Sequence, residues 1–473
     1  MDFYTYGAPG AYDSELCQEE IWREYAECGL NVMFLTGNNS YYGGGWENSQ
    51  AKKCFDIARN IGVDKVILHD ERIVELIVGD DTLVGSGEEY KFQSEAELDA
   101  YVKQCMQEYA HEKGLYGIRL KDEPQMQHLK SCGQVYRSVK RVAKDLGFDY
   151  FYILMNLLPL VGDYPVVTIP DGKERTITEE YEYYLDAFMK ETGADTLAVD
   201  NYPFRPRYSG GIFMLGYYSC FQIMRKVCDK YHAKMSFVLQ SFEMIHKTKP
   251  EATAGFRRIT TANEMMLQMN SALGFGVREI AFFTYVTKTG AEIPNYRSAD
   301  GSAFVTNTGT KTRIYEFAKS AIADAKKLEN ILFAYDFKGA KLFLHETCNE
   351  ECPGLYLGGA EFTTLGGTRK GAEFDNSYIP QWCKKITHDR DIMLVTEFEK
   401  EGENPHMMMI QNVLDIVYKV DLIPMKATVE FENCNCVKAF KHGEWKEIEL
   451  LNGIYETELA VGEAVYVIPF SKS

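Results

Sequence analysis

Eight runs rich in β-branched and aromatic residues recur along the first 285 positions of the chain, and each is followed by a stretch with helical periodicity. Most of the runs are almost continuously apolar. That pattern is typical of strands covered on both faces, as in a parallel sheet wrapped by helices. The predicted strands are residues 3–8, 30–36, 63–69, 115–121, 149–157, 195–201, 234–242 and 277–285.

Several of the helical stretches end at a glycine just before the next strand. The predicted helices include residues 15–28, 95–112, 125–146, 179–191 and 262–273. Glycine is common after a helix C-terminus because it accepts the left-handed backbone conformation. It stands at such positions here as Gly29, Gly62, Gly114, Gly147, Gly193 and Gly274.

This repetition predicts an α/β fold, a (β/α)8 TIM barrel that spans residues 1–331. A doubly wound open sheet is the competing fold. That fold usually carries a glycine-rich phosphate-binding turn after its first strand, and the turn at residues 7–12 lacks this fingerprint.

The pattern changes after a last helical stretch at residues 309–330. From Phe333 onward the apolar runs are short and separated by turn residues, for example at 339–344, 407–410, 427–431 and 464–470. Short strands at this spacing predict a small antiparallel β-sandwich over residues 332–473. We expect this domain to be an accessory that supports the barrel or assists assembly.

Two of the apolar runs end in a glutamate, Glu123 after the fourth and Glu243 after the seventh. In a (β/α)8 barrel these strand ends open on the face where active sites are built. Paired carboxyl groups there suit glycoside cleavage, which needs a proton on the leaving oxygen and a nucleophile or activated water at the anomeric carbon. A single glutamate at a strand end is most often only a loop residue, so the pair carries the prediction.

We expect Glu123 to be the acid/base, with its pKa raised by partial burial or by the second carboxylate. Pro124 supports this placement because a proline stops the strand and fixes the turn. Glu243 is expected to stay ionised and to act as the nucleophile of a retaining mechanism.

With these two glutamates, residues 1–330 resemble the retaining (β/α)8 glycoside hydrolases of clan A, which include β-galactosidases, β-mannanases and cellulases. The resemblance implies Glu123 as the acid/base and Glu243 as the nucleophile. It also implies that Tyr202, after strand six, hydrogen-bonds the nucleophile and that Tyr285 or Phe283 floors the sugar subsite.

The sequence differs from the family pattern at two positions. The resemblance therefore implies the mechanism of the family but no particular substrate. Asp122 stands where the family typically has asparagine, and the aromatic residue after strand eight is not the usual tryptophan. An ionised aspartate can only accept hydrogen bonds from a sugar hydroxyl.

Further polar and aromatic side chains near strand ends would line a site for a polyhydroxylated ligand. The predicted substrate contacts are Asp122, Tyr202, Asp200, Asn201, Asn38, His69, Asn156, Gln240, Tyr285 and Trp46. Each could instead cap a loop or be satisfied in the core, and the loop that carries Trp46 could close over a sugar or be a mobile surface loop. Arg119 and Lys121 could bind an acidic substrate, but buried ion pairs inside the barrel are favoured.

The composition limits the partners of the protein. The chain has 473 residues, of which 45% are hydrophobic and 25% charged, as expected for a globular protein with one large and one smaller unit. A net charge of −18 works against binding of nucleic acid and anionic membranes, and no window is long and apolar enough to cross a bilayer. The expected partner is a carbohydrate substrate, and formation of a homo-oligomer is left open.

Twelve cysteines are scattered from Cys17 to Cys436 without a disulfide framework, which fits reduced thiols. His345, Cys348 and Cys352 lie close together, but no second cluster completes a four-ligand zinc set, so neither a metal nor a cofactor is expected. The first residues lack the basic start and apolar stretch of a secretory signal. This favours a cytoplasmic protein, with secretion after removal of a signal as the alternative.

Two other functions stay open. One is a non-catalytic carbohydrate-binding barrel that has lost turnover. The other is a metal-dependent or Schiff-base barrel enzyme, which needs a cluster of histidine and carboxylate ligands or a lysine in an apolar pocket. Of nine histidines, only His69 falls at a predicted strand end. The sugar, its linkage, and exo or endo action are not determined by the sequence.

Overall fold

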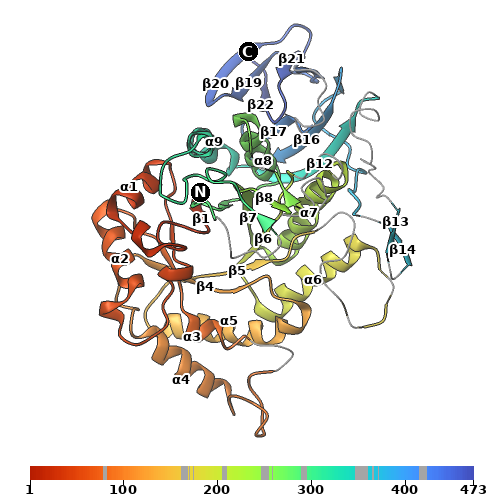
Figure 1. Ribbon diagram of the computed structural model, residues 1–473. Coiled ribbons are helices and arrows are strands. Elements are labelled where there is room, and N and C mark those ends of the chain that lie inside the picture. The colour runs from red at the N-terminus through yellow and green to blue at the C-terminus, as the bar shows by residue number, and fades with distance from the viewer. Residues whose placement is uncertain are drawn as a thin grey trace.

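The computed structural model describes residues 1–77, 82–160, 169, 171–173, 175–204, 210–246, 255–257, 259–288, 296–346, 361–364, 367–370, 372–414 and 423–472. The chain forms a (β/α)8 barrel followed by antiparallel sheets, as the sequence predicts (Figure 1).

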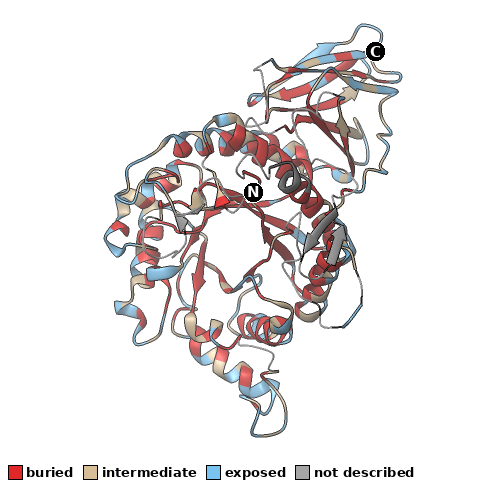
Figure 2. Ribbon diagram, turned by 45° about the vertical axis from the view of Figure 1, so that its right-hand side comes forward, coloured by how far each residue is buried: buried red, intermediate tan, exposed pale blue. Residues whose placement is uncertain are grey.

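Eight parallel strands form the barrel wall in the order β1-β10-β7-β6-β5-β4-β3-β2. They are β1 (Asp2–Thr5), β2 (Met33–Phe34), β3 (Val66–His69), β4 (Leu115–Asp122), β5 (Tyr152–Leu157), β6 (Thr196–Asp200), β7 (Lys234–Gln240) and β10 (Glu279–Phe283). The first two strands meet where the Val32 N–H donates to the Phe3 carbonyl at 3.2 Å. Each strand overlaps one predicted run, and Figure 2 shows the strands as a buried ring.

The helices surround this ring. They are α1 (Glu19–Glu27), α2 (Gln50–Ile61), α3 (Glu71–Val74), α4 (Glu95–Met106), α5 (Leu129–Asp145), α6 (Ile177–Thr192), α7 (Gly210–Tyr231), α8 (Ala262–Gly274) and α9 (Arg313–Leu332). The side chains of Thr176 and Thr261 cap the starts of α6 and α8 by accepting backbone N–H groups. Gly193 ends α6 in the left-handed conformation, as predicted, but after α8 this conformation falls on Gly276 and not on Gly274.

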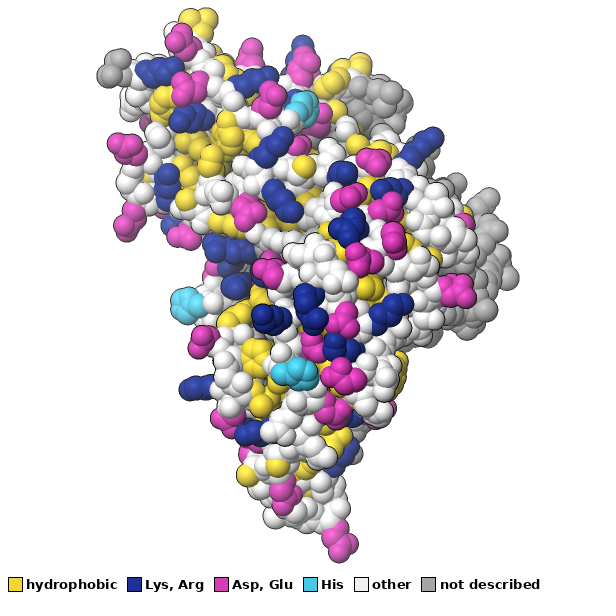
Figure 3. Space-filling model, turned by 90° about the vertical axis from the view of Figure 1, so that its left-hand side faces the viewer, with side chains coloured by type: hydrophobic (Ala, Val, Ile, Leu, Met, Phe, Trp, Pro, Cys, Tyr) yellow, Lys and Arg dark blue, Asp and Glu magenta, His cyan; other side chains and the backbone are white. Residues whose placement is uncertain are grey.

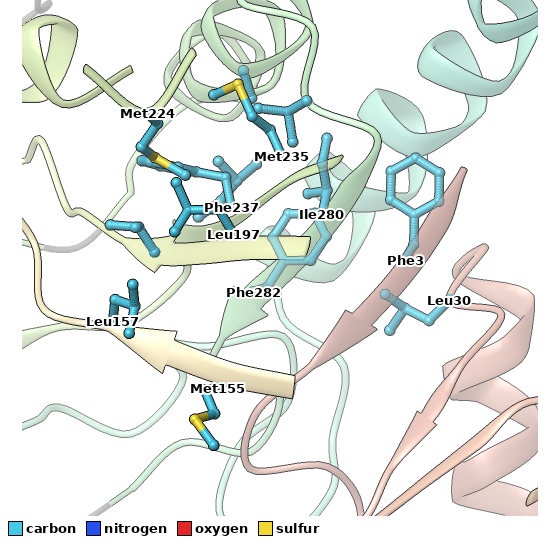
Figure 4. Close-up of a cluster of buried hydrophobic side chains, with 14 of the residues drawn as sticks. Phe3, Leu30, Met155, Leu157, Leu197, Met224, Met235, Phe237, Ile280 and Phe282 are labelled. Atoms are coloured by element: carbon cyan, nitrogen blue, oxygen red, sulfur yellow. The ribbon is translucent and has the colours of Figure 1, made fainter. Parts of the chain in front are cut away.

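Alternation along the strands separates an outer layer from an inner one. The outer layer packs against the helices and is shown in Figure 4 with Phe3, Met155, Leu157, Leu197, Phe237 and Ile280 among its members. Tyr4, Phe34, Leu154, Ala198 and Val238 belong to a separate cluster of inward-facing residues. Because side chains alternate with a period of two, residues two positions beyond inward-facing ones also point into the barrel, at its C-terminal mouth.

The C-terminal sheets form the predicted β-sandwich. One sheet has the order β12-β16-β17-β22-β19-β20 and the other β15-β18-β21. The strands are β12 (Asp336–Leu344), β15 (Lys385–His388), β16 (Ile392–Glu399), β17 (His406–Asn412), β18 (Met425–Glu430), β19 (Cys436–Lys441), β20 (Glu444–Glu449), β21 (Ile454–Leu459) and β22 (Ala464–Phe470). Val395 and Ile410 of the larger sheet share a core with Ala427 and Val429 of the smaller.

The structure also contains two smaller sheets. β8 (Met244–His246), β9 (Gly255–Phe256) and β11 (Tyr296–Arg297) form a three-stranded sheet in the order β11-β8-β9. β13 (Glu361–Thr364) pairs with β14 (Gly367–Lys370).

Buried hydrogen bonds fasten the sandwich to the barrel. Gln411 of β17 is fully buried, and its Nε2 donates to the Leu267 carbonyl of α8 at 2.9 Å. The Ser271 hydroxyl of the same helix donates to Gln411 Oε1 at 3.1 Å. A buried amide that lost these partners would be left without hydrogen bonds. The two contacts therefore fix the position of the sandwich relative to α8.

Within the described part of the chain, no helix combines the length and the apolar character that a membrane crossing requires. Figure 3 shows acidic and basic side chains interspersed on one face of the molecule, so the net charge of −18 does not appear there as a field of one sign.

A buried carboxyl group lies at the opposite end of the barrel from the mouth. Glu279, the first residue of β10, is 5% exposed and accepts a 2.6 Å hydrogen bond from the Tyr152 hydroxyl. Burial raises the pKa of Glu279 to about 7, although the hydrogen bond from Tyr152 works against this shift.

We predict that Glu279→Gln removes a pH-dependent loss of stability. The folded-state pKa lies above the value of about 4.3 for an unfolded glutamate. Protonated Glu279 therefore stabilises the fold fully below pH of about 4.3, and this contribution is lost as the pH rises through about 7. Glutamine has no charge to desolvate, so the variant should gain about 1–3 kcal/mol in unfolding free energy relative to wild type between pH 5 and pH 8. Urea unfolding of both proteins at the two pH values measures this, and an advantage that does not grow with pH would contradict it.

Candidate active site

Polar side chains crowd the C-terminal mouth of the barrel on three neighbouring strands. Asp122 ends β4, Asn156 lies on β5 and Asp200 ends β6. Asp122 stands opposite Asn156 in the strand register, and a bulge between Arg119 and Asp122 precedes this pairing. Asn156 and Asp200 lie two positions beyond the inward-facing Leu154 and Ala198, so both point into the barrel. The Asn156 Nδ2 donates to Asp200 Oδ1 at 2.8 Å.

Glu123 follows β4 with a positive backbone φ of 46°, which is uncommon for a residue with a Cβ atom. Its N–H donates to the Asn156 carbonyl at 2.7 Å, and the next carbonyl, of Pro124, accepts a 2.6 Å hydrogen bond from the Tyr184 hydroxyl. Such a conformation costs about 1–3 kcal/mol and persists where neighbouring groups fix the backbone, often at functional sites.

Electrostatics link Glu123 to Asp200. Burial, then the charges of Asp200 and Asp122, raise the pKa of Glu123 to about 8, against the opposing charge of Arg119. Burial likewise raises the pKa of Asp200 to about 7, although hydrogen bonds from Asn156 and Tyr202 favour its ionised form. Two close carboxyl groups in such surroundings titrate as a pair, and near neutral pH the pair holds about one proton. The site thus presents an acid next to a carboxylate.

Three side chains around this pair have a buried polar atom without a partner among the described residues. These atoms are the Tyr6 hydroxyl, Asn156 Oδ1 and Arg119 Nε. Burial and the nearby charge of Asp122 raise the pKa of Tyr6, which is 7% exposed. Buried polar groups are rarely left unpaired, so unpaired atoms around one pair of carboxyl groups indicate that a ligand or water binds there.

Tyr6 was missed as a site residue at the sequence level. The available signal was the Tyr4-Thr5-Tyr6 alternation in the first run, which places Tyr6 on the same inward face as Tyr4.

An ion-pair chain supports the acidic side of the mouth. Arg119 lies 2.9 Å from the Asp122 carboxylate, so it forms an ion pair as expected, but the pair is not buried because the Asp122 side chain is 48% exposed. His69, 4% exposed, lies between Arg119 and Glu71, with its Nδ1 3.3 Å from the guanidinium and its Nε2 3.1 Å from the carboxylate. His69 and Asp122 therefore reach the mouth as predicted, and their contact with substrate stays a prediction.

Tyr202 also lies at the mouth, on the loop after β6. Its ring packs against Phe242 and Phe283 with centroid distances of 5.0 and 6.1 Å. Its side chain hydrogen-bonds Asp200 and so lowers the pKa of that carboxyl. The resemblance implies that this tyrosine contacts the nucleophile, and the described contact is with Asp200.

Glu243 lies beyond the end of β7 and is 9% exposed. Its Oε1 accepts the Ala299 N–H at 3.2 Å, and its carbonyl accepts the Ser298 hydroxyl. The preceding Phe242 packs on Tyr202, so this segment passes the barrel mouth. The groups that set the pKa of Glu123 are Asp200, Asp122 and Arg119, and the pairing of Glu123 with Glu243 stays a prediction.

Two predicted substrate contacts are wrong because hydrogen bonds of the fold occupy their side chains. Trp46 is 5% exposed and donates its indole N–H to Glu112 at 2.8 Å, so its loop is packed and does not present the ring to a sugar. Gln240 is fully buried, and its side chain accepts from the Phe204 N–H at 3.0 Å and donates to the Arg257 carbonyl at 2.8 Å.

Two others are wrong because they face away from the barrel interior. Asn201 is the residue after the inward-facing Asp200, and its Nδ2 donates to the Leu160 carbonyl at 2.9 Å. Tyr285 is fully buried, with its ring 5.1 Å from that of Tyr25 in α1. Phe283, the other candidate after strand eight, belongs to the inward-facing group.

Asn38 is exposed in a short turn, Gly37–Asn39, where its N–H donates to the Ala11 carbonyl. Its contact with substrate stays a prediction. Among the described residues, no group of three or more His, Cys, Asp or Glu side chains could hold a metal ion, and Cys348 and Cys352 lie outside those residues.

The structural role of Trp46 is testable. Trp46→Phe keeps a ring but leaves Glu112 without its indole donor, so we expect a loss of about 1–3 kcal/mol in unfolding free energy. The KM of the variant should equal that of wild type. Urea unfolding and steady-state kinetics measure the two quantities. Unchanged stability together with a raised KM would restore Trp46 to the binding site.

No protein-family model and no curated protein sequence matches the chain. An Anoxybacillus α-amylase structure is similar, with a TM-score of 0.52 at 12% identity over 100% of this chain and 98% of the amylase chain. A glycoside hydrolase family 27 β-L-arabinopyranosidase from Geobacillus stearothermophilus has a TM-score of 0.48 at 11% identity, with 100% and 96% of the two chains covered. The likeness to the amylase shows that the two proteins share their fold over nearly their full lengths.

Proposed function

We propose that the protein is a glycoside hydrolase that cleaves an O-glycosidic bond with Glu123 as the acid/base. One observation carries the proposal: Glu123 and Asp200 are neighbouring carboxyl groups at the barrel mouth with pKa values raised to about 8 and about 7. At neutral pH a protonated Glu123 is ready to donate to a leaving oxygen while a carboxylate remains beside it. In addition, the Anoxybacillus α-amylase that shares the fold is described as a glycosyl hydrolase.

The surroundings of the pair suit a sugar as the substrate. The unpaired polar atoms of Tyr6, Asn156 and Arg119 include donors and an acceptor for hydroxyl groups. The rings of Tyr6, Tyr202 and Phe283 belong to the same inward-facing cluster and offer flat apolar faces. Convergent polar atoms against an aromatic wall are a common design of small-molecule sites.

A retaining mechanism would proceed in two displacements. A carboxylate attacks the anomeric carbon and forms a glycosyl ester while Glu123 gives its proton to the leaving oxygen. Glu123, now ionised, then removes a proton from the water that hydrolyses the ester. The overall reaction consumes one water and restores both carboxyl groups.

Two residues are candidates for the nucleophile. The resemblance gives this role to Glu243, whose carboxylate is oriented by the Ala299 N–H. Asp200 is the second candidate, because it influences Glu123 directly and because Asn156 and Tyr202 hydrogen-bond its ionised form.

Glu123→Gln should separate substrates by their leaving groups. Glutamine keeps the shape but has no acidic proton, so kcat/KM on sugar or alkyl glycosides should fall by about 10²–10⁴-fold. Dinitrophenyl glycosides, whose leaving group needs little protonation, should lose far less. Rate assays on a panel of glycosides of both kinds measure this, and near-normal rates on all of them would remove the assignment.

The pH profile gives an independent reading. Wild-type activity should decrease as the pH rises through about 8, because the acid/base Glu123 loses its proton. Activity should also decrease as the pH is lowered through about 7, because the carboxylate of Asp200 gains a proton. In Glu123→Gln the alkaline limb should disappear for dinitrophenyl glycosides, because no proton at position 123 remains to be lost.

Azide rescue should identify the nucleophile. We expect Asp200→Ala and Glu243→Ala to differ, since azide can occupy the space of the missing carboxylate and attack the anomeric carbon only where the nucleophile was removed. Restored turnover with a glycosyl azide of inverted configuration would mark that residue, and Asp122→Asn is the matched control.

The wild-type protein gives two further tests. An initial product with inverted configuration in NMR would remove the retaining mechanism. Binding without hydrolysis of any panel sugar would favour the non-catalytic barrel.

A further inference from the structure

The C-terminal sandwich has a cavity of about 490 Å³ lined by its own residues. The cavity lies where four segments meet: the residues before β15, the β16–β17 turn, the β18–β19 connection and the end of β22. Loops at the end of a β-sandwich are a frequent place for recognition, because a rigid pair of sheets holds them.

An aromatic platform forms one wall. Trp382 stacks on His406 with ring centroids 4.5 Å apart and an interplanar angle of 18°. Trp22 and Trp46 are buried in the barrel, whereas Trp382 is half-buried beside the cavity. Within the described chain, the indole N–H of Trp382 has no hydrogen-bond partner. The ring therefore offers both an apolar face and a polar edge.

A buried carboxylate fixes this platform. Glu397 of β16 is fully buried and accepts the backbone N–H of Gln381 at 2.8 Å and that of Trp382 at 3.3 Å. It also accepts the Tyr378 hydroxyl at 2.5 Å. Three donors on one carboxylate hold the segment before a ligand arrives, which reduces the ordering cost of binding.

The remaining walls carry short polar groups. Asn404, Asn433 and Ser471 lie around the cavity, and Glu432 is the one acidic residue that faces it, with neither lysine nor arginine among the described lining residues. Without a cation the cavity does not suit phosphate or another anion. A flat ring with amides and a hydroxyl around it suits a sugar, which presents an apolar face and a ring of hydroxyl groups.

We propose that this cavity binds a saccharide unit of a polymeric substrate, distant along that substrate from the bond that the barrel cleaves. The inference rests on the proposed function only in taking the bound saccharide to be part of the substrate of the barrel. The Tyr335 hydroxyl, just beyond α9, donates to the Asn404 carbonyl at 2.7 Å. This hydrogen bond connects one wall of the cavity to the end of the last barrel helix.

Binding can be measured without turnover by using Glu123→Gln as the parent protein. Native gels that contain xylan, galactomannan, β-glucan or starch should retard this protein in at least one case. Adding Trp382→Ala should weaken the apparent affinity about tenfold, the equivalent of about 1.4 kcal/mol for one aromatic face. Trp382→Phe should retain part of it. Tyr183→Ala, which removes an exposed ring on α6, is the matched control and should have no effect.

Kinetics on otherwise wild-type protein complete the test. Trp382→Ala should leave kcat/KM on a small aryl glycoside unchanged and lower it about tenfold on the retarding polymer. Failure of every polymer to retard the parent, or equal retardation with and without the Trp382 ring, would overturn the inference. Retardation that depends on Trp382 in a protein that hydrolyses no glycoside would instead overturn the proposed function and leave the sugar site standing.

Discussion

The arrangement on which the proposed chemistry depends is the electrostatic coupling of Glu123, which is solvent-exposed at the barrel mouth, to the buried carboxyl group of Asp200. The negative charges of Asp200 and Asp122 disfavour ionisation of Glu123, and burial disfavours ionisation of Asp200, so the pair retains about one proton near neutral pH. Strand β5 holds them together, because the Asn156 carbonyl accepts the Glu123 N–H while the Asn156 amide donates to Asp200. The cost of the arrangement is met by the rigidity of the barrel, whose apolar outer layer packs the strands against the helices.

The two ends of the barrel treat buried acids differently, and the difference separates stability from function. At the base, Glu279 accepts the Tyr152 hydroxyl, and the charges of Lys234 and Lys65 favour its ionised form. At the mouth, Tyr6 and Asn156 retain unpaired polar atoms within the described residues. In (β/α)8 proteins the base stabilises the fold and the mouth performs the reaction. If the mouth served only stability, pairing these atoms or replacing them with apolar groups would make the fold more stable.

The sequence predicted the barrel strands, the sandwich and the position of Glu123 at a strand end, because apolar runs and glycine positions depend on local chemistry. It could not predict which way a side chain points after a strand ends. Gln240 occupies the last inward position of β7, yet backbone groups of Phe204 and Arg257 take its amide. The link between Glu123 and Asp200 depends on a bulge in β4, which changes the facing of the last residues of that strand. The prediction for Trp46 failed because the sequence does not show whether a ring in a glycine-rich loop packs into the protein, as Trp46 does, or covers a ligand.

The attachment of the sandwich gives the proposed sugar site its physical consequence. Buried contacts between Gln411 and α8, and between Tyr335 and Asn404, connect the sheets to the barrel through short, directional hydrogen bonds. A polymer held at Trp382 would therefore be held in a fixed position relative to the barrel, and not through a flexible linker. Tethering raises the effective concentration of the second binding event only for chains whose length spans the two sites. A small glycoside cannot span them, so the sandwich would favour long substrates without altering the chemistry at Glu123.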